Sequence, residues 1–96
     1  KKIKYDTTQL SQVDTVNYGI KSSYTVITGT DIKHGMQTKK WKNGKSITEY
    51  NLGYPVTTVM YDNDFLFSKV TYYPNSYEMK TSEIFEKDGS VRTTNV

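Results

Sequence analysis

The chain has 96 residues, 34% of them hydrophobic and 14% aromatic, with nine tyrosines and no cysteine. This length permits one domain rather than two, and the lack of cysteine excludes disulfides and thiolate chemistry. No apolar run approaches the roughly 20 residues that a membrane-spanning helix needs, so we expect no membrane span.

The net charge of +3 is unevenly distributed. Residues 1–45 contain nine basic and three acidic side chains and carry +6, whereas residues 46–96 contain four basic and seven acidic side chains and carry −3. Such asymmetry can steer an acidic partner to one part of the molecule, or it can keep a small sheet protein soluble. The charge pattern leaves both roles open.

Residues 1–20 are polar and weakly patterned. Leu10, Val13 and Val16 have helical spacing, which would allow a short helix. The β-branched side chains of Val13 and Val16 and the turn-like residues 17–19 favour a strand or an ordered arm equally well. The remaining chain, residues 23–94, is predicted to form the body of one domain that spans residues 1–96.

From Ser23 onward the alternation of side chains indicates strands, and the best hairpin lies between Gly35 and Gly53. Asn43-Gly44 favours a two-residue type I′ turn, because both residues accept a positive φ. With that loop Lys42 would face Lys45 and Trp41 would face Ser46. The predicted register separates two groups of side chains, with Lys40, Lys42 and Lys45 on one face and Trp41 and Tyr50 on the other.

Further turn signals follow at intervals of roughly 9 to 13 residues, as in a ladder of short strands. They are Leu52-Gly53, Asn63-Asp64, Asn75-Ser76 and Asp88-Gly89. Strands are predicted at residues 56–61, 65–73, 77–86 and 90–94, for a total of six or seven. Because sequential strands pair with their neighbours, we expect an all-β antiparallel meander that forms a curled sheet, a half-barrel or a small sandwich.

Residues 39–53 resemble the MORN-repeat-variant pattern, in which an aromatic residue precedes Asn-Gly, a lysine and a tyrosine-containing strand closed by glycine. Residues 72–80 with 85–89 look like a second copy, so the resemblance covers about residues 35–90. Asp64 and Ser76 stand where the pattern has glycine. The resemblance implies stacked hairpins used as a scaffold, as in antitoxin components or exported proteins, and it implies no catalytic residues.

Basic and aromatic side chains around the predicted hairpin are the best candidate binding residues. We expect a non-enzymatic interaction module that recognises an acidic protein partner through this hairpin, or that accepts a strand at a sheet edge, including one from a second copy in a homodimer. Single-stranded nucleic acid is the alternative ligand, because lysines beside aromatic rings combine charge neutralisation with base stacking. The candidate residues are Lys39, Lys40, Trp41, Lys42, Lys45, Tyr50, Tyr61 and Tyr73.

Neither an enzyme nor a metal site is predicted. His34 is the only histidine, and no motif ties it to a nucleophile. Asp62 and Asp64 resemble the start of a calcium loop that lacks its glycine and its distant glutamate. We therefore expect no catalytic residue, metal or cofactor. The chain begins at Lys1 rather than Met, and its Thr, Asn and Tyr content favours export to the periplasm or cell surface over the cytoplasm.

Overall fold

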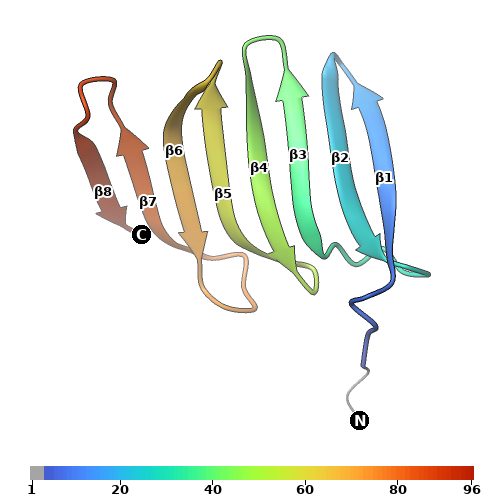
Figure 1. Cartoon of the computed structure of the whole chain (residues 1–96). Helices are drawn as coiled ribbons and strands as arrows, with labels where there is room; N and C mark the ends of the chain where they lie inside the picture. The colour runs from blue at the N-terminus through green and yellow to red at the C-terminus, as the bar shows by residue number, and fades with distance from the viewer. Residues whose placement is uncertain (1–3) are drawn as a thin grey trace.

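The computed structural model describes residues 4–96, and residues 1–3 of the weakly patterned N-terminal segment lie outside them. Eight antiparallel strands form one sheet in strictly sequential order, β1-β2-β3-β4-β5-β6-β7-β8 (Figure 1). The strands are β1 (Leu10–Asn17), β2 (Ile20–Ile27), β3 (Gly35–Trp41), β4 (Gly44–Asn51), β5 (Tyr54–Asp62), β6 (Phe65–Tyr72), β7 (Met79–Phe85) and β8 (Val91–Asn95).

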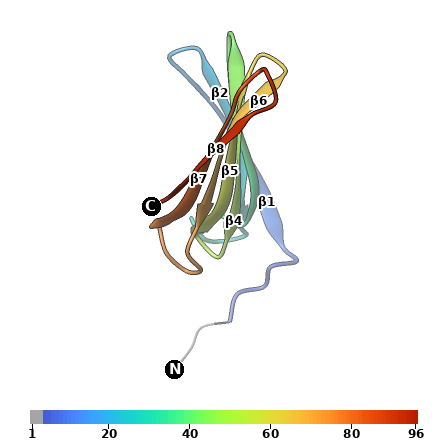
Figure 2. The same cartoon turned by 90° about the vertical axis from the view of Figure 1, so that its left-hand side faces the viewer.

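The predicted all-β meander is confirmed, and it takes the form of an open, twisted sheet (Figure 2). The sheet is not closed, and no second sheet packs against it within residues 4–96, so the sandwich alternative is not formed. The possible N-terminal helix is not formed either. Residues Leu10 to Asn17 are instead strand β1, because each of them pairs with a residue of β2. In the part of the chain described, no helix is long and apolar enough to cross a membrane.

Two hairpins have the turn chemistry that the sequence indicates. The loop residues Tyr18 and Gly19 have φ values of 52° and 78°, and Leu52 and Gly53 have values of 47° and 90°. Two successive positive φ values define the type I′ turn, whose twist matches that of the strands it joins. These loops therefore set the β1–β2 pairing, which is unbroken, and the β4–β5 pairing, whose register shifts once between Glu49 and Tyr50.

The predicted type I′ turn at Asn43-Gly44 is wrong. Trp41 pairs with Gly44, so the loop consists of Lys42 and Asn43, and neither these residues nor Gly44 has a positive φ. Gly44 serves close packing instead, since a Cβ there would collide with the carbonyl oxygen of Tyr61 and lie 3.0 Å from Trp41 Nε1. The loop therefore begins one residue earlier than predicted, and the pairing shifts by two residues, so that Lys40 rather than Lys42 faces Lys45.

Very little of the molecule is buried, because one sheet has no second layer to pack against. Val26 and Ile27 are the buried hydrophobic residues among those described, and Gln37 and Ser68 are the buried polar ones. The accessible surface is 7098 Å², compared with about 5,700 Å² expected for a compact monomer of 11.1 kDa. Both faces of the sheet are thus largely open to solvent.

Candidate functional site

Three lysines form a row across adjacent strands on one face of the sheet. Lys21 of β2 lies opposite Lys40 of β3, and Lys40 lies opposite Lys45 of β4. Directly opposed residues of an antiparallel pair share a face, with Cβ atoms about 4.5–5.5 Å apart. We call Lys21, Lys40 and Lys45 the lysine row, and the face that carries them the lysine face.

None of the three lysines of the row forms an ion pair with another residue in the part of the chain that the structure describes. Residues 4–96 contain one ion pair, between Arg92 and Glu86, which lies far from the row near β8. Lys45 Nζ instead sits 4.8 Å from the ring centroid of Tyr61, in a cation–π contact. At the other end of the row Val16 lies opposite Lys21. The lysine row is therefore a concentration of positive charge held by strand pairing rather than by carboxylates.

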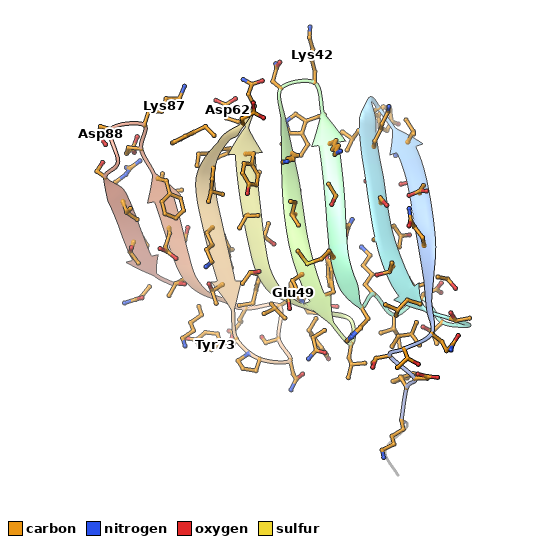
Figure 3. All side chains as sticks on the ribbon, in the orientation of Figure 1. Lys42, Glu49, Asp62, Tyr73, Lys87 and Asp88 are labelled. Carbon is orange, nitrogen blue, oxygen red and sulfur yellow. The ribbon has the colours of Figure 1, made fainter. Side chains whose placement is uncertain are left out.

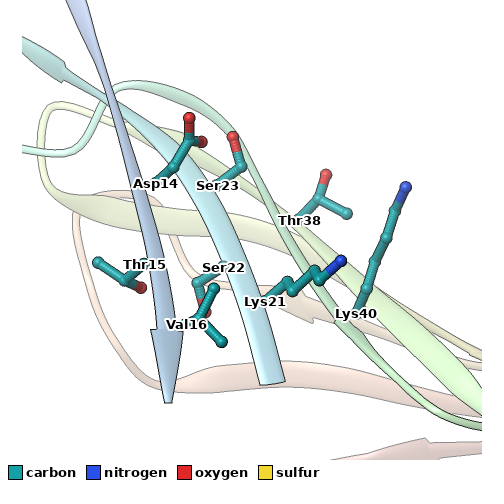
Figure 4. A pocket seen from close by; sticks show the side chains of 8 residues that line it. All are labelled: Asp14, Thr15, Val16, Lys21, Ser22, Ser23, Thr38 and Lys40. Atoms are coloured by element: carbon teal, nitrogen blue, oxygen red, sulfur yellow. The ribbon is translucent and has the colours of Figure 1, made fainter. Parts of the chain in front are cut away.

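A shallow groove of about 420 Å³ runs along the lysine face over β1, β2 and β3 (Figure 4). The ammonium ends of Lys21 and Lys40 lie toward one side of it, and the Asp14 carboxylate and the Ser23 hydroxyl toward the other. Asp14 accepts hydrogen bonds from Gln12 Nε2 at 3.1 and 3.3 Å. Hydrogen bonding from Gln12, and then from Ser23, lowers the pKa of Asp14, which stays ionised at neutral pH.

On the opposite face of the sheet the central lysine, Lys33, is paired with neighbouring side chains. Lys33 Nζ donates a hydrogen bond of 3.0 Å to Gln37 Oε1 and lies 4.7 and 5.1 Å from the ring centroids of Tyr24 and Tyr50. Burial, together with the nearby charge of Lys39, lowers the pKa of Lys33. We call this side the tyrosine face.

Hydroxyl groups on the tyrosine face form a short chain across three strands. Thr48 Oγ1 and Thr58 Oγ1 are 2.9 Å apart, and Thr58 Oγ1 is 3.3 Å from the Tyr72 hydroxyl. These groups line a cavity of about 490 Å³ together with Gln37 and Tyr50. Burial, and after it Tyr72 and Tyr77, raise the pKa of Tyr50. The polar groups at the centre of this face are thus largely paired with one another.

The predicted binding residues do not form a single site. Lys40, Lys45 and Tyr61 come together on the lysine face. Lys39 and Tyr50 line the cavity on the tyrosine face. Trp41 packs beside Gly44 near one end of β3. Lys42 and Tyr73 lie at opposite ends of the sheet (Figure 3). The platform of flat rings is therefore divided between the two faces and the far end of the sheet.

Lys21 is the member of the site that sequence reasoning missed. Its place beside Lys40 follows from the β2–β3 register. The connection of residues 28–34 between these strands turns at Gly29 but is too long for a turn type to set that register. The same connection contains His34, whose Nδ1 accepts the Leu52 N–H at 3.1 Å. His34 therefore anchors the β4–β5 turn.

Comparisons with models of protein families, with curated proteins and with solved structures give no match to this chain. The resemblance of residues 35–90 to the MORN-repeat variant stays a prediction, and function must be argued from the geometry.

Proposed function

We propose that this domain is a non-enzymatic protein-interaction module that docks an acidic segment of a partner protein on the lysine row. The observation that carries the proposal is the direct opposition of Lys21, Lys40 and Lys45 on adjacent strands, none of which forms an ion pair with residues 4–96. Like charges placed directly opposite each other in a sheet are destabilising. An acidic segment lying across the row would relieve that repulsion on binding.

The open faces of the sheet support a role in binding. The accessible surface exceeds that of a compact monomer of the same mass by about 1,400 Å². The large apolar side chain of Val16, which is 72% exposed, lies opposite Lys21 at the end of the lysine row. A partner that covers this part of the sheet would bury apolar surface as well as neutralise charge.

The surroundings of the row favour an acidic protein over a nucleic acid. Asp14 lies in the groove beside Lys21 and Lys40, and Asp64 lies beside Lys45, so negative charge interrupts any continuous path for phosphates. The Tyr61 ring already has the Lys45 ammonium over it, which leaves that face of the ring closed to a base. Ser23 and Thr38 hydroxyls offer hydrogen bonds to a peptide in the same groove.

Fluorescence anisotropy tests the proposal with two labelled probes, a peptide with glutamate at every second position and an oligothymidylate. We expect the peptide to bind, and each of Lys21→Gln, Lys40→Gln and Lys45→Gln to raise its Kd roughly two- to fivefold, as for the loss of an exposed ion pair. Lys69→Gln is the matched control, because Lys69 shares the lysine face but lies opposite Glu83.

Two results would overturn the assignment. If the row variants bind the peptide as well as the parent protein and Lys69→Gln do, the row is not the docking site. If the oligothymidylate binds more tightly than the peptide, and its affinity falls steeply between about 50 and 200 mM salt, the ligand is single-stranded nucleic acid.

A further inference from the structure

The two edges of the sheet differ in length and in protection. Strand β1 has eight residues and pairs with β2 in an unbroken register, whereas β8 has five residues and carries Arg92. Proteins usually protect an edge with charged side chains, especially lysine, with proline or with a bulge; β1 contains one charged residue, Asp14, and has no lysine, proline or bulge. The described residues that precede β1 leave the sheet below it rather than covering its edge (Figure 1). Strand β1 is therefore an open template for another strand.

The hydrogen-bonding direction along β1 is fixed by its pairing with β2. Thr28 N donates to the Gln9 carbonyl at 2.9 Å, and Asn17 flanks the two-residue turn opposite Ile20. Bonded and non-bonded pairs alternate in an antiparallel ladder, so odd-numbered residues of β1 direct their backbone groups toward β2. The even-numbered residues direct theirs toward the open edge. These are Leu10, Gln12, Asp14 and Val16.

We propose that β1 pairs with β1 of a second copy, antiparallel, about a twofold axis that passes beside Val13. In this register Leu10 lies opposite Val16 of the second copy, and Gln12 lies opposite Asp14. All four residues that present backbone groups at the edge then make hydrogen-bonded pairs. Two sheets would join into one continuous sheet, and this inference does not depend on the lysine row.

Dimer registers in which the twofold axis is shifted by one residue lose these favourable side-chain pairs. The exposed side chains of Leu10 (40%) and Val16 (72%) cover each other only when the axis lies at Val13. Moving the axis by one residue to Asp14 places two carboxylates directly opposite each other, which is destabilising. Moving it to Gln12 places Leu10 opposite Asp14 and leaves Val16 without a partner. Side-chain complementarity therefore selects the register centred on Val13.

Single cysteine substitutions in β1 can determine the register of the dimer directly, because the native chain contains no cysteine. At Val13 the two chains would form a non-hydrogen-bonded pair with Cα atoms about 4.5 Å apart, within reach of a disulfide. We expect Val13→Cys to form a disulfide-linked dimer under mild oxidation, and Gln12→Cys, Asp14→Cys and Thr15→Cys to do so much more slowly. Faster cross-linking at any of the other three positions would overturn the proposed register.

Charge substitutions at Gln12 provide a second readout by sedimentation equilibrium. Gln12→Lys places a lysine opposite Asp14 of the second copy twice in each dimer, so we expect the dimer Kd to fall roughly two- to thirtyfold. Gln12→Glu should raise it by a similar factor. Both variants lose the same hydrogen bond from Gln12 to Asp14, which makes them a matched pair.

Gln12→Pro removes an N–H at the open edge and none from the β1–β2 ladder, so it should abolish the dimer while the circular dichroism spectrum stays that of a sheet. A native chain that remains monomeric at all concentrations would overturn the proposal. Lys40→Gln distinguishes the dimer proposal from the proposed function, because that variant should lose affinity for the acidic peptide and still dimerise.

Discussion

On the tyrosine face the ammonium of Lys33 has a glutamine carbonyl as acceptor and two tyrosine rings around it, whereas on the lysine face Lys21, Lys40 and Lys45 lie opposite one another and form no ion pair with the residues described. Lys33 is thus hydrogen-bonded within the sheet, whereas the three lysines of the row lie opposite like charges. A paired polar group contributes to folding, while an unpaired row of like charge is expected to be satisfied only by a partner. We therefore expect substitutions that unpair Lys33 to lower the free energy of unfolding, and substitutions in the lysine row to raise it while weakening the binding of a partner.

The largest expected effect is a loss of stability when the hydrogen bond of Lys33 on the tyrosine face is removed. Gln37 is 5% exposed and accepts the hydrogen bond of Lys33. Gln37→Leu leaves that ammonium without its acceptor, so we expect the free energy of unfolding in urea to fall by about 1–3 kcal/mol. Lys39→Gln, on the same face but exposed, should change it by less than about 0.5 kcal/mol. Equal losses in the two variants would contradict the structural role of Gln37.

A smaller effect of the opposite sign is expected on the lysine face. Lys40→Gln removes two like-charge oppositions, with Lys21 and Lys45, so the free energy of unfolding should rise by about 0.4–2 kcal/mol. The gain should shrink as salt is added. Lys69→Gln should instead lower stability slightly, because Lys69 lies opposite Glu83. A loss of stability in Lys40→Gln would show that the row is not repulsive.

The smallest expected effect is the change in the free energy of unfolding at alkaline pH, which tests the pairing around Lys33 and Tyr50. Burial raises the pKa of Tyr50 above 10.0, so its contribution to stability is complete below pH 10 and is lost as pH rises through the folded-state pKa. Burial lowers the pKa of Lys33 below 10.5, so stability should increase as pH rises from that lowered pKa toward 10.5.

The contributions of Lys33 and Tyr50 are distinguished by measuring the free energy of unfolding in urea across this pH range. Tyr50→Phe should remove the decline in the free energy of unfolding at high pH and leave the preceding rise intact. A decline that persists unchanged in Tyr50→Phe would assign it to another residue.

The sequence predicts the meander well because turn chemistry is local. Residue pairs such as Leu52-Gly53 tolerate positive φ values, and this tolerance can be read without knowing what lies across the sheet. The Asn43-Gly44 prediction was wrong because a non-local contact decides the role of Gly44, which has the Tyr61 carbonyl and the Trp41 ring against it.

The candidate site was only partly predictable for the same reason. The grouping of Lys40 and Lys45 on one face persists because the pairing differs from the predicted one by two residues, which leaves each side chain on the same face. Lys21 joins them through the β2–β3 register, which depends on a long irregular connection. Residues 10–17 were ambiguous because their strand is settled by pairing with β2 rather than by their own propensity.

Strictly sequential strand order also determines how the molecule should fold and open. Every contact between strands joins neighbours in the chain, so each hairpin can form without waiting for a distant segment. Topologies dominated by local contacts fold fast, and linear arrays lose structure from their ends inward. Amide hydrogen exchange should accordingly be fastest in the short terminal strand β8 and slowest in the central strands β4 and β5.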